Sequence, residues 1–162
     1  MMDFAEWLSV LEHSSLAEVM RHSLWTYPIV EIVHIVGFAL LVGSVVLFDL
    51  RLLGFSRTVS IRALERHLLP WSWVALLLIV PSGVAMLSAH ATDFFANPAF
   101  RVKLLLIAFA GVNALTFHNG VFRSVSTWDQ HQPTPPAAKA SALLSLAIWL
   151  GVISCGRLIA YL

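Results

Sequence analysis

His34 is the residue whose chemistry is hardest to explain by packing, because it stands in the apolar stretch Ile32-Val33-His34-Ile35-Val36. A neutral imidazole is the usual axial ligand of haem iron and a common ligand of copper and zinc. An ionisable group inside a membrane helix is costly, so such a group is by default a candidate for function. We therefore interpret His34 as the first candidate ligand of a metal cofactor.

Further polar side chains are expected at the depth of His34. His34 follows Pro28 by six residues and Lys103 follows Pro98 by five. At 1.5 Å per residue, both lie roughly 8–9 Å below the starts of their helices. Arg157 falls at about the same level on the fourth helix, Glu31 lies one turn above His34 on the same face, and His90 ends the second helix at the outer boundary. The resulting His34 cluster consists of Glu31, His34, His90, Lys103 and Arg157.

The members of the His34 cluster would have different roles in binding a haem. A six-coordinate haem iron has two axial ligands, and either the neutral amine of Lys103 or the imidazole of His90 can be the second. Arg157 stays protonated and would pair with a propionate. Gly37, one turn after His34, has no side chain and would let a flat macrocycle approach the helix. In the alternative interpretation, Lys103 and Arg157 extend to the membrane surface and Gly37 permits close helix packing.

A second candidate site lies at the other end of the predicted helices. His67 opens the second apolar run and His118 closes the third, so the two histidines share a depth. Two histidines on neighbouring helices would hold a second haem. The alternative is that histidine costs little near the membrane surface and has no such role. Asp49 and Arg51 close the first run and belong to the same polar group, with the alternative that they are simple charges at a helix end.

The elements that must position these residues are transmembrane helices. Hydrophobic residues make up 59% of the 162 residues and charged residues 12%, whereas a soluble domain carries about 25% charged residues. Four apolar runs of about 20 residues have the length that crosses a hydrocarbon core of about 30 Å. The sequence therefore predicts an all-α integral membrane four-helix bundle. The predicted spans are residues 28–50, 67–89, 98–120 and 141–162.

Residues 1–27 are interpreted as a separate amphipathic segment. Phe4, Trp7 and Leu8 repeat at helical spacing, and Asp3 with Glu6 has the spacing of a capping box. Such a segment would lie at the membrane surface as an interfacial helix. The alternative is that it packs on the bundle as a lid.

Three stretches of the chain share their pattern of polar residues with a known family. The matching residues are His34, Asp49, Arg51 and Leu52 in the stretch 31–53, Glu65, Arg66, Leu68 and Gly83 in the stretch 64–87, and the segment from Lys103 to His118. In this pattern the chain, over residues 31–120, resembles the HemJ-type protoporphyrinogen oxidases and the related CopD-like four-helix membrane proteins. The resemblance implies a four-helix membrane scaffold.

The same resemblance implies a cofactor. In the HemJ-type family a histidine of the first helix and a lysine of the third are associated with b-type haem, and these positions correspond to His34 and Lys103. The fourth helix departs from the family, because it lacks the C-terminal Asn-Glu-x-Pro signature and carries Gly156, Arg157 and Tyr161 instead. The resemblance therefore implies a haem-binding scaffold more directly than it implies oxidase activity.

Composition narrows the classes of function. The net charge is +1 without a basic tract, which argues against nucleic-acid binding. The single Cys155 excludes an internal disulfide and any CxxC motif. The leading hypothesis is a membrane protein that binds one or two haem b groups and transfers electrons, as a homo-oligomer or a complex subunit serving a quinone or a periplasmic redox partner.

Three alternatives remain beside electron transfer. The first is a protoporphyrinogen oxidase of the HemJ type. The second is a copper-handling protein of the CopD-like type, in which Met20 and Met86 could add soft ligands. His22 and His90 would be the neighbouring imidazoles. The third is a structural subunit without a cofactor.

The charges in the short loops predict the orientation in the membrane. The loop after the first span and the loop after the third are rich in arginine and lysine, and the positive-inside rule places such loops in the cytoplasm. Both termini and the His34 cluster would then face outward, which is the periplasm for a bacterial cytoplasmic membrane. The basic residues are Arg51, Arg57, Arg62 and Arg66 in the first loop region, and Arg123 and Lys139 in the second.

Reporter fusions test this orientation. A reporter active only in the cytoplasm should be active when fused near Arg57 or Asp129, and inactive when fused at the C-terminus. A reporter active only in the periplasm should give the opposite pattern. A cytoplasmic C-terminus would contradict the predicted orientation and place the His34 cluster on the cytoplasmic side.

Overall fold

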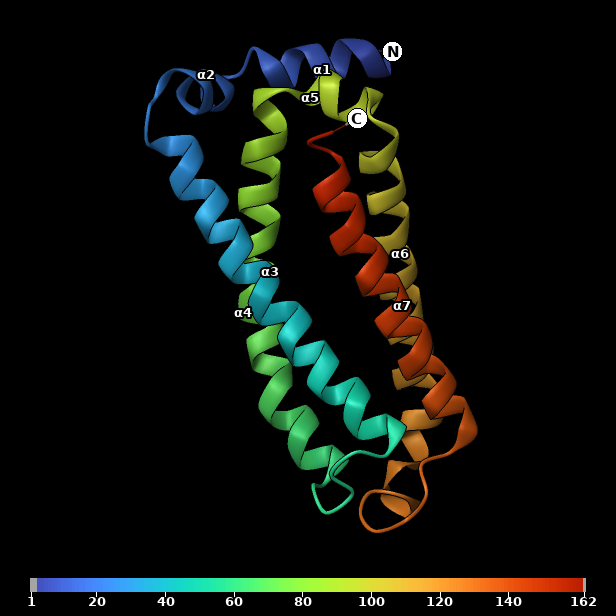
Figure 1. Cartoon of the computed structure of the whole chain (residues 1–162). Coiled ribbons are helices and arrows are strands. Elements are labelled where there is room, and N and C mark those ends of the chain that lie inside the picture. The colour runs from blue at the N-terminus through green and yellow to red at the C-terminus, as the bar shows by residue number, and fades with distance from the viewer. Residues whose placement is uncertain (1–2, 162) are drawn as a thin grey trace.

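The computed structural model describes residues 3–161, and this part of the chain is helical throughout its regular structure (Figure 1). Four of its helices are long and apolar enough to cross a membrane, so the chain is a multi-pass membrane protein. The elements are α1 (Phe4–Glu12), α2 (Ser15–His22), α3 (Thr26–Leu53), α4 (Ile61–Ala89), α5 (Ala91–Ala96), α6 (Pro98–Asn119), the 3₁₀ helix η1 (Val121–Thr127) and α7 (Pro136–Leu158).

The four long helices form two hairpins. α3 packs on α4 and α6 packs on α7, while α3 and α7 make the main contact between the hairpins. Both ends of the described chain lie at the same end of the bundle, together with α1, α2 and α5 (Figure 1). We call this the terminal end. The opposite end, with the 54–60 loop and η1, is the loop end.

α3, α4 and α7 begin before the predicted apolar spans, because additional turns precede the hydrocarbon-length segment, whereas α6 begins at residue 98 as predicted. α4 begins at Ile61 rather than residue 67, with Ser60 as its N-cap, and α7 begins at Pro136 rather than residue 141. α3 covers 26–53 and ends at Gly54, whose φ of 109° suits glycine. Residues 1, 2 and 162 of the predicted segments lie outside the described residues.

The N-terminal segment is two helices that lie across the terminal end (Figure 1). The predicted capping box of Asp3 and Glu6 is present at the start of α1. Arg21 ties α2 to both neighbours, donating from Nη1 to the Ala89 carbonyl at 3.0 Å and from Nη2 to the Glu12 carbonyl at 2.7 Å. Hydrogen bonds from the side chain and backbone of Thr92 lower the pKa of the Glu12 carboxyl.

This segment packs on the bundle, as the second of the two predicted arrangements has it, and it also exposes apolar side chains. Ala17 and Met20 of α2 are buried, so the segment packs on the bundle. Phe4, Trp7 and Val19 are exposed, so it also presents apolar side chains at the level where the long helices end. Aromatic side chains at that level are typical of a membrane–water interface.

The hydrophobic core lies at the loop end, where both hairpins and η1 meet. A buried cluster there joins α3, α4, α6, η1 and α7. The bundle is therefore packed most tightly at this end, whereas the hairpins diverge toward the terminal end (Figure 1). The buried members are Leu52, Ile61, Phe117, Val125, Trp128, Ala138 and Ala142.

Arg51 is not a simple charge at a helix end, the alternative that the sequence left open. Its side chain is only 2% exposed, and Nε donates to the Val59 carbonyl at 2.6 Å. Nη2 donates to the Asp129 carbonyl at 2.8 Å. The Asp129 carboxylate in turn accepts from Ser60 Oγ at 2.9 Å and from the Arg62 backbone N–H at 3.0 Å. We call Arg51, Ser60 and Asp129 the loop staple, because they tie the 54–60 loop to the segment after η1.

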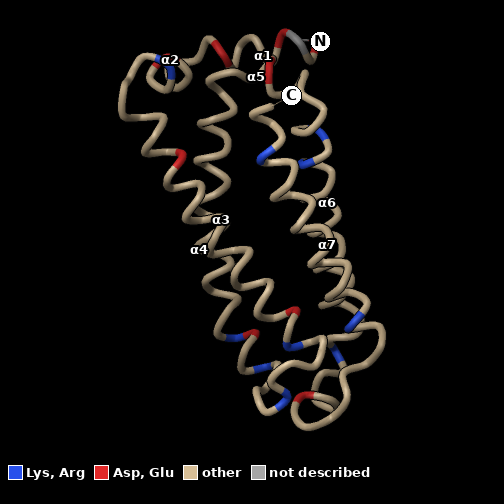
Figure 2. Tube along the Cα trace, in the orientation of Figure 1, with Lys and Arg blue, Asp and Glu red and all other residues tan. Residues whose placement is uncertain are grey.

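Figure 2 shows that positive charges gather at the loop end, where the chain carries its basic loops. Arg62 and Arg66 are exposed in the first turns of α4. The charge difference between the two ends is the pattern from which the orientation was predicted.

Asp129→Ala should destabilise the protein by about 2 kcal/mol, because the hydrogen bonds that the charged carboxylate accepts are lost. Burial raises the pKa of Asp129, but hydrogen bonds from the Arg62 N–H, the Ser60 hydroxyl and the Ile61 N–H outweigh it and lower the pKa. A lowered folded-state pKa means that the contribution is present at neutral pH and lost as the pH falls through that value. Thermal unfolding in detergent should therefore show a difference between wild type and Asp129→Ala that shrinks in acid. A pH-independent difference would contradict this account.

Candidate functional site

His34 lies at the contact between α3 and α4, and α4 fixes its orientation. Nδ1 is 3.0 Å from Ser82 Oγ, and a Cβ added to Gly83 would stand 3.2 Å from the ring atom Cε1. The Ser82 hydroxyl donates to the backbone carbonyls of Leu78 and Ile79. Because its proton is directed there, Ser82 Oγ accepts from His34, and Nδ1 carries the imidazole proton.

The lone pair of His34 Nε2 is consequently free. No hydrogen bond to Nε2 is formed within residues 3–161. This arrangement, with one ring nitrogen donating and the other unprotonated, is the one that metal-ligating histidines adopt. The ring is half-buried, so protein and lipid rather than bulk water surround it.

Lys103 approaches the same region from α6. Its Nζ lies 3.9 Å from the position of a Cβ on Gly156 of α7, and the side chain is half-buried. Leu106 lies 2.9 Å from the Cβ position of Gly151, so α6 and α7 pack closely beside it.

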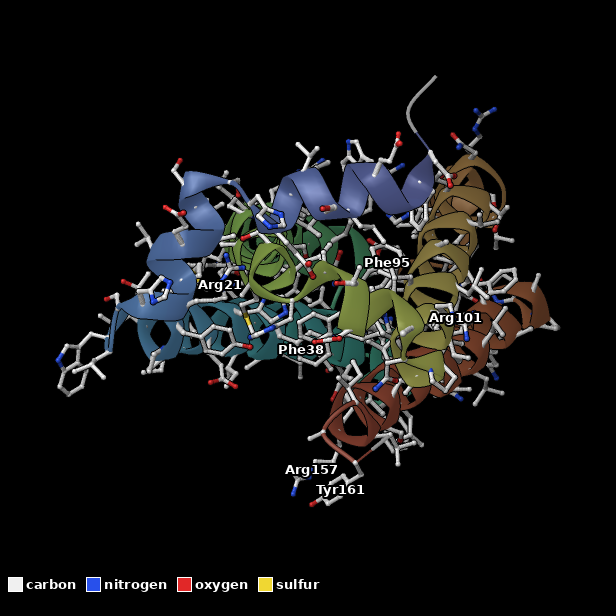
Figure 3. All side chains as sticks on the ribbon, turned by 90° about the horizontal axis from the view of Figure 1, so that it is seen from above. Arg21, Phe38, Phe95, Arg101, Arg157 and Tyr161 are labelled. Atoms are coloured by element: carbon white, nitrogen blue, oxygen red, sulfur yellow. The ribbon has the colours of Figure 1, made fainter. Side chains whose placement is uncertain are left out.

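Two other members of the His34 cluster lie on the surface. Arg157 is exposed, donates to the Tyr161 hydroxyl and stacks over that ring at 4.8 Å from the centroid. Figure 3 shows both side chains directed away from the bundle. Glu31 is exposed one turn before His34 on α3. The structure therefore does not bring Arg157 to His34, as pairing with a propionate of the same haem would require.

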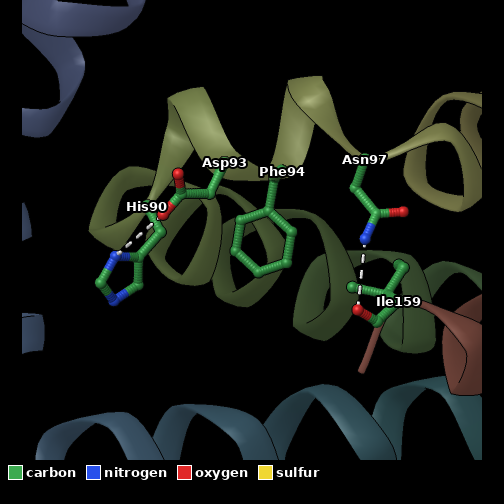
Figure 4. A pocket seen from close by; sticks show the side chains of 5 residues that line it. All are labelled: His90, Asp93, Phe94, Asn97 and Ile159. Atoms are coloured by element: carbon green, nitrogen blue, oxygen red, sulfur yellow. Dashed lines mark hydrogen bonds and ion pairs between the residues drawn. The ribbon is translucent and has the colours of Figure 1, made fainter. Parts of the chain in front are cut away.

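His90 lies closer to the terminal end than His34 does. It follows Gly83 by seven residues, which is about 10 Å along α4 at 1.5 Å per residue. Its Nδ1 is 3.9 Å from Asp93 Oδ2, and both line an open groove of about 300 Å³ with Phe94, Asn97 and Ile159 (Figure 4). His90 therefore lies at a different depth from His34.

Gly37 serves helix packing rather than the approach of a macrocycle. An added Cβ would stand 2.9 Å from Leu78 Cβ, 3.0 Å from Ile79 Cγ1 and 3.2 Å from the Ala75 carbonyl oxygen. Because α4 fills the space beside Gly37, no planar ligand can lie there. The expectation of a haem face at Gly37 is corrected to the packing alternative.

The structure does not bring His67 and His118 together. Both are exposed, and they lie on α4 and α6, which pack on α3 and α7 respectively rather than on each other. His118 Nδ1 donates to the Ala114 carbonyl at 2.8 Å, and its ring packs on Phe117 and Phe122. Within the described chain, no three histidine, cysteine or acidic side chains converge as a metal site.

Sequence reasoning missed Ser82 as the residue that orients His34. Ser82 stands between Pro81 and Gly83, and this Pro-Ser-Gly sequence inside an apolar run was the available signal. Gly83 matched the family pattern, but only the structure shows that its missing side chain makes room for the imidazole.

Comparison with known proteins gives a family. The model of a family of unknown function, DUF6644, matches residues 11–162. The chain belongs to this family. The match covers all four long helices of this DUF6644 protein, including His34, Ser82 and Lys103. No curated protein and no solved structure matches the chain.

Gly37→Ala should destabilise the α3–α4 hairpin by about 1–3 kcal/mol, because the added methyl group overpacks the contact with Leu78 and Ile79. Gly43→Ala on the same helix is the matched control, since an added Cβ there meets nothing within 4 Å. Thermal unfolding of both purified variants in the same detergent should show a loss for Gly37→Ala alone. Equal stability of the two variants would contradict the packing role.

Proposed function

We propose that this DUF6644 protein binds b-type haem within the membrane and transfers electrons, with His34 as an axial ligand. The observation that carries the proposal is the contact of His34 Nδ1 with Ser82 Oγ at 3.0 Å, which engages one ring nitrogen and leaves Nε2 without a hydrogen bond among residues 3–161. The contact between α3 and α4 uses only Nδ1 of this imidazole. Nε2 has no structural role there and is available as a ligand. The resemblance to HemJ-type proteins supports the same ligand.

Two residues around His34 would suit a bound haem. Ser82 holds the imidazole plane, which is the role that an outer hydrogen-bond partner plays at metal-ligating histidines. Lys103, on the other hairpin, offers an amine that can be the second ligand. The bound haem would supply one-electron exchange at its iron, and the apolar surroundings would set its potential.

An aromatic pair borders the site on the side of the loop end. Phe38 lies one turn after His34 on α3, and its ring meets Trp149 of α7 edge to face at 6.1 Å. This pair joins the two hairpins and separates His34 from the tightly packed core at the loop end. The proposed cofactor would therefore lie toward the terminal end, with its partner a quinone in the bilayer or a periplasmic redox protein.

Copper handling is the second candidate function, favoured by one observation. Met20 and His90 line a common groove of about 430 Å³ between α2, α3 and α4 at the terminal end. A thioether and an imidazole suit copper. This site does not include His34, so metal analysis of variants distinguishes the two functions.

The haem proposal is tested by expression with an adequate haem supply and an absorption spectrum of the purified protein. Wild type should show a Soret band, and His34→Ala should abolish it, because an axial ligand is lost. Lys103→Met should shift the band if the amine is the second ligand. Ser82→Ala should weaken haem retention without removing the ligand.

His118→Ala is the matched control for the haem test, since this histidine is exposed at the loop end. It should leave the Soret band unchanged. Wild-type protein that contains neither Soret absorption nor iron would refute the proposal. If the protein then contained copper that Met20→Ala or His90→Ala removed, the copper function would be supported instead.

A further inference from the structure

Asp49 is a carboxylic acid buried inside the bundle toward the loop end of α3. Its side chain is 4% exposed, and its Oδ2 atom is buried without a hydrogen-bond partner in the described chain. An ionised carboxylate in such a place is costly unless it is paired and hydrogen-bonded. Ionisable residues at buried positions of membrane helices are commonly parts of ion or proton pathways.

No counter-charge offsets Asp49. Arg51, two residues further along α3, binds the backbone carbonyls of the loop staple instead. α4 carries Glu65 and α7 carries Lys139 toward the loop end, but neither forms an ion pair with Asp49 among residues 3–161. The charged residues of α2 lie at the terminal end.

α7 and α6 supply a ladder of polar side chains beside Asp49. Ser145 of α7 is buried and lies against the Asp49 carboxyl. Ser141 lies one turn nearer the start of α7 on the same face. Its Oγ donates to Asn113 Oδ1 at 3.0 Å, and Asn113 Nδ2 donates to the Ser141 carbonyl at 3.0 Å. Because α7 starts at the loop end, the ladder leads from Asp49 toward that aqueous surface.

We propose that Asp49 is a proton-binding site within the bundle, and that Ser145, Ser141 and Asn113 connect it to water at the loop end. On loading, a proton supplied by hydronium at that surface forms an O–H bond with Asp49, and the carboxyl becomes neutral. On unloading, the O–H bond breaks and the proton returns to water, with no transfer of electrons. This inference is independent of the haem proposal, because the site lies on the other side of the Phe38–Trp149 pair.

A proton fits this site better than a metal cation does. Hard cations such as calcium and magnesium take six or more oxygen ligands. Asp49 and Ser145 offer one carboxyl and one hydroxyl, and the next side-chain oxygens, on Ser141 and Asn113, bond to each other. A proton needs only the unpartnered Oδ2 atom.

Infrared spectroscopy of the protein in lipid nanodiscs tests the proposal. Protein labelled with ¹³C-aspartate should show an isotope-shifted carboxylic acid band at neutral pH, and alkaline titration should remove it. Asp49→Asn should abolish this band. The chain has only three other aspartates, and Asp3, Asp93 and Asp129 all lie outside the long helices.

Ser145→Ala provides an independent test that holds even if Asp49→Asn does not fold. This variant should shift the carboxylic acid band, because the hydroxyl beside the acid is lost. Ser44→Ala is the matched control, since Ser44 is a buried serine of α3 whose hydroxyl donates to the Leu40 carbonyl at 2.8 Å. It should leave the band in place.

Three outcomes would overturn the inference. The first is the absence of an isotope-shifted carboxylic acid band at neutral pH, which would show that Asp49 is ionised. The second is a band that Ser145→Ala leaves unchanged, which would remove the polar ladder. The third is a band that sodium removes at constant pH, which would make Asp49 a cation site.

Discussion

Hydrocarbon offers no hydrogen-bond partner, and this constraint determines where the polar side chains of the bundle lie. Ser82 donates to backbone carbonyls of its own helix and contacts His34 Nδ1, so these polar groups are partners of one another. Ser141 and Asn113 satisfy each other between α6 and α7. At the ends of the bundle, Arg21 and Arg51 bind carbonyls that helix ends and loops leave free. Three buried side-chain atoms of the described chain are exceptions without a partner, namely Asp49 Oδ2, Arg51 Nη1 and Thr134 Oγ1.

The same constraint makes close packing of α3 on α4 the frame of the candidate site. Gly37 lets the helices approach, and Gly83 leaves room for the imidazole of His34. One close contact thus sets the distance between the helices, the rotamer of the histidine and the direction of its free nitrogen. The second hairpin adds Lys103 and meets the first through Phe38 and Trp149.

The helices of this protein follow from length and hydrophobicity, whereas the contacts between them do not. Four apolar runs were sufficient to predict four spans, and depth counting placed His34 and Lys103 at one level. Counting along a helix gives height but no rotation, so it assigned Arg157 to the same cluster although this side chain faces away. Gly37 was misread for the same reason, because only the position of α4 shows which face is occupied.

Charge at a helix end was the other ambiguous signal. Asp49 and Arg51 could not be told from ordinary end charges, since sequence gives no measure of burial. Arg51 donates to the backbone carbonyl of residue 129, and every residue type has such a carbonyl. The sequence therefore could not identify this partner. The core at the loop end also includes Val125 of η1. This element is too short to show the apolar pattern of a membrane-spanning helix, so the sequence did not reveal its part in the core.

The loop staple has a consequence for how the chain is assembled. Synthesis runs from the N-terminus, so the first hairpin enters the bilayer before residue 129 has been made. Until then, Arg51 and Ser60 lack their partners on Asp129. Arg51 can therefore reach its complete set of hydrogen bonds only after the segment that follows η1 has been made. The formation of the loop staple therefore depends on the order in which the segments of the chain are synthesised.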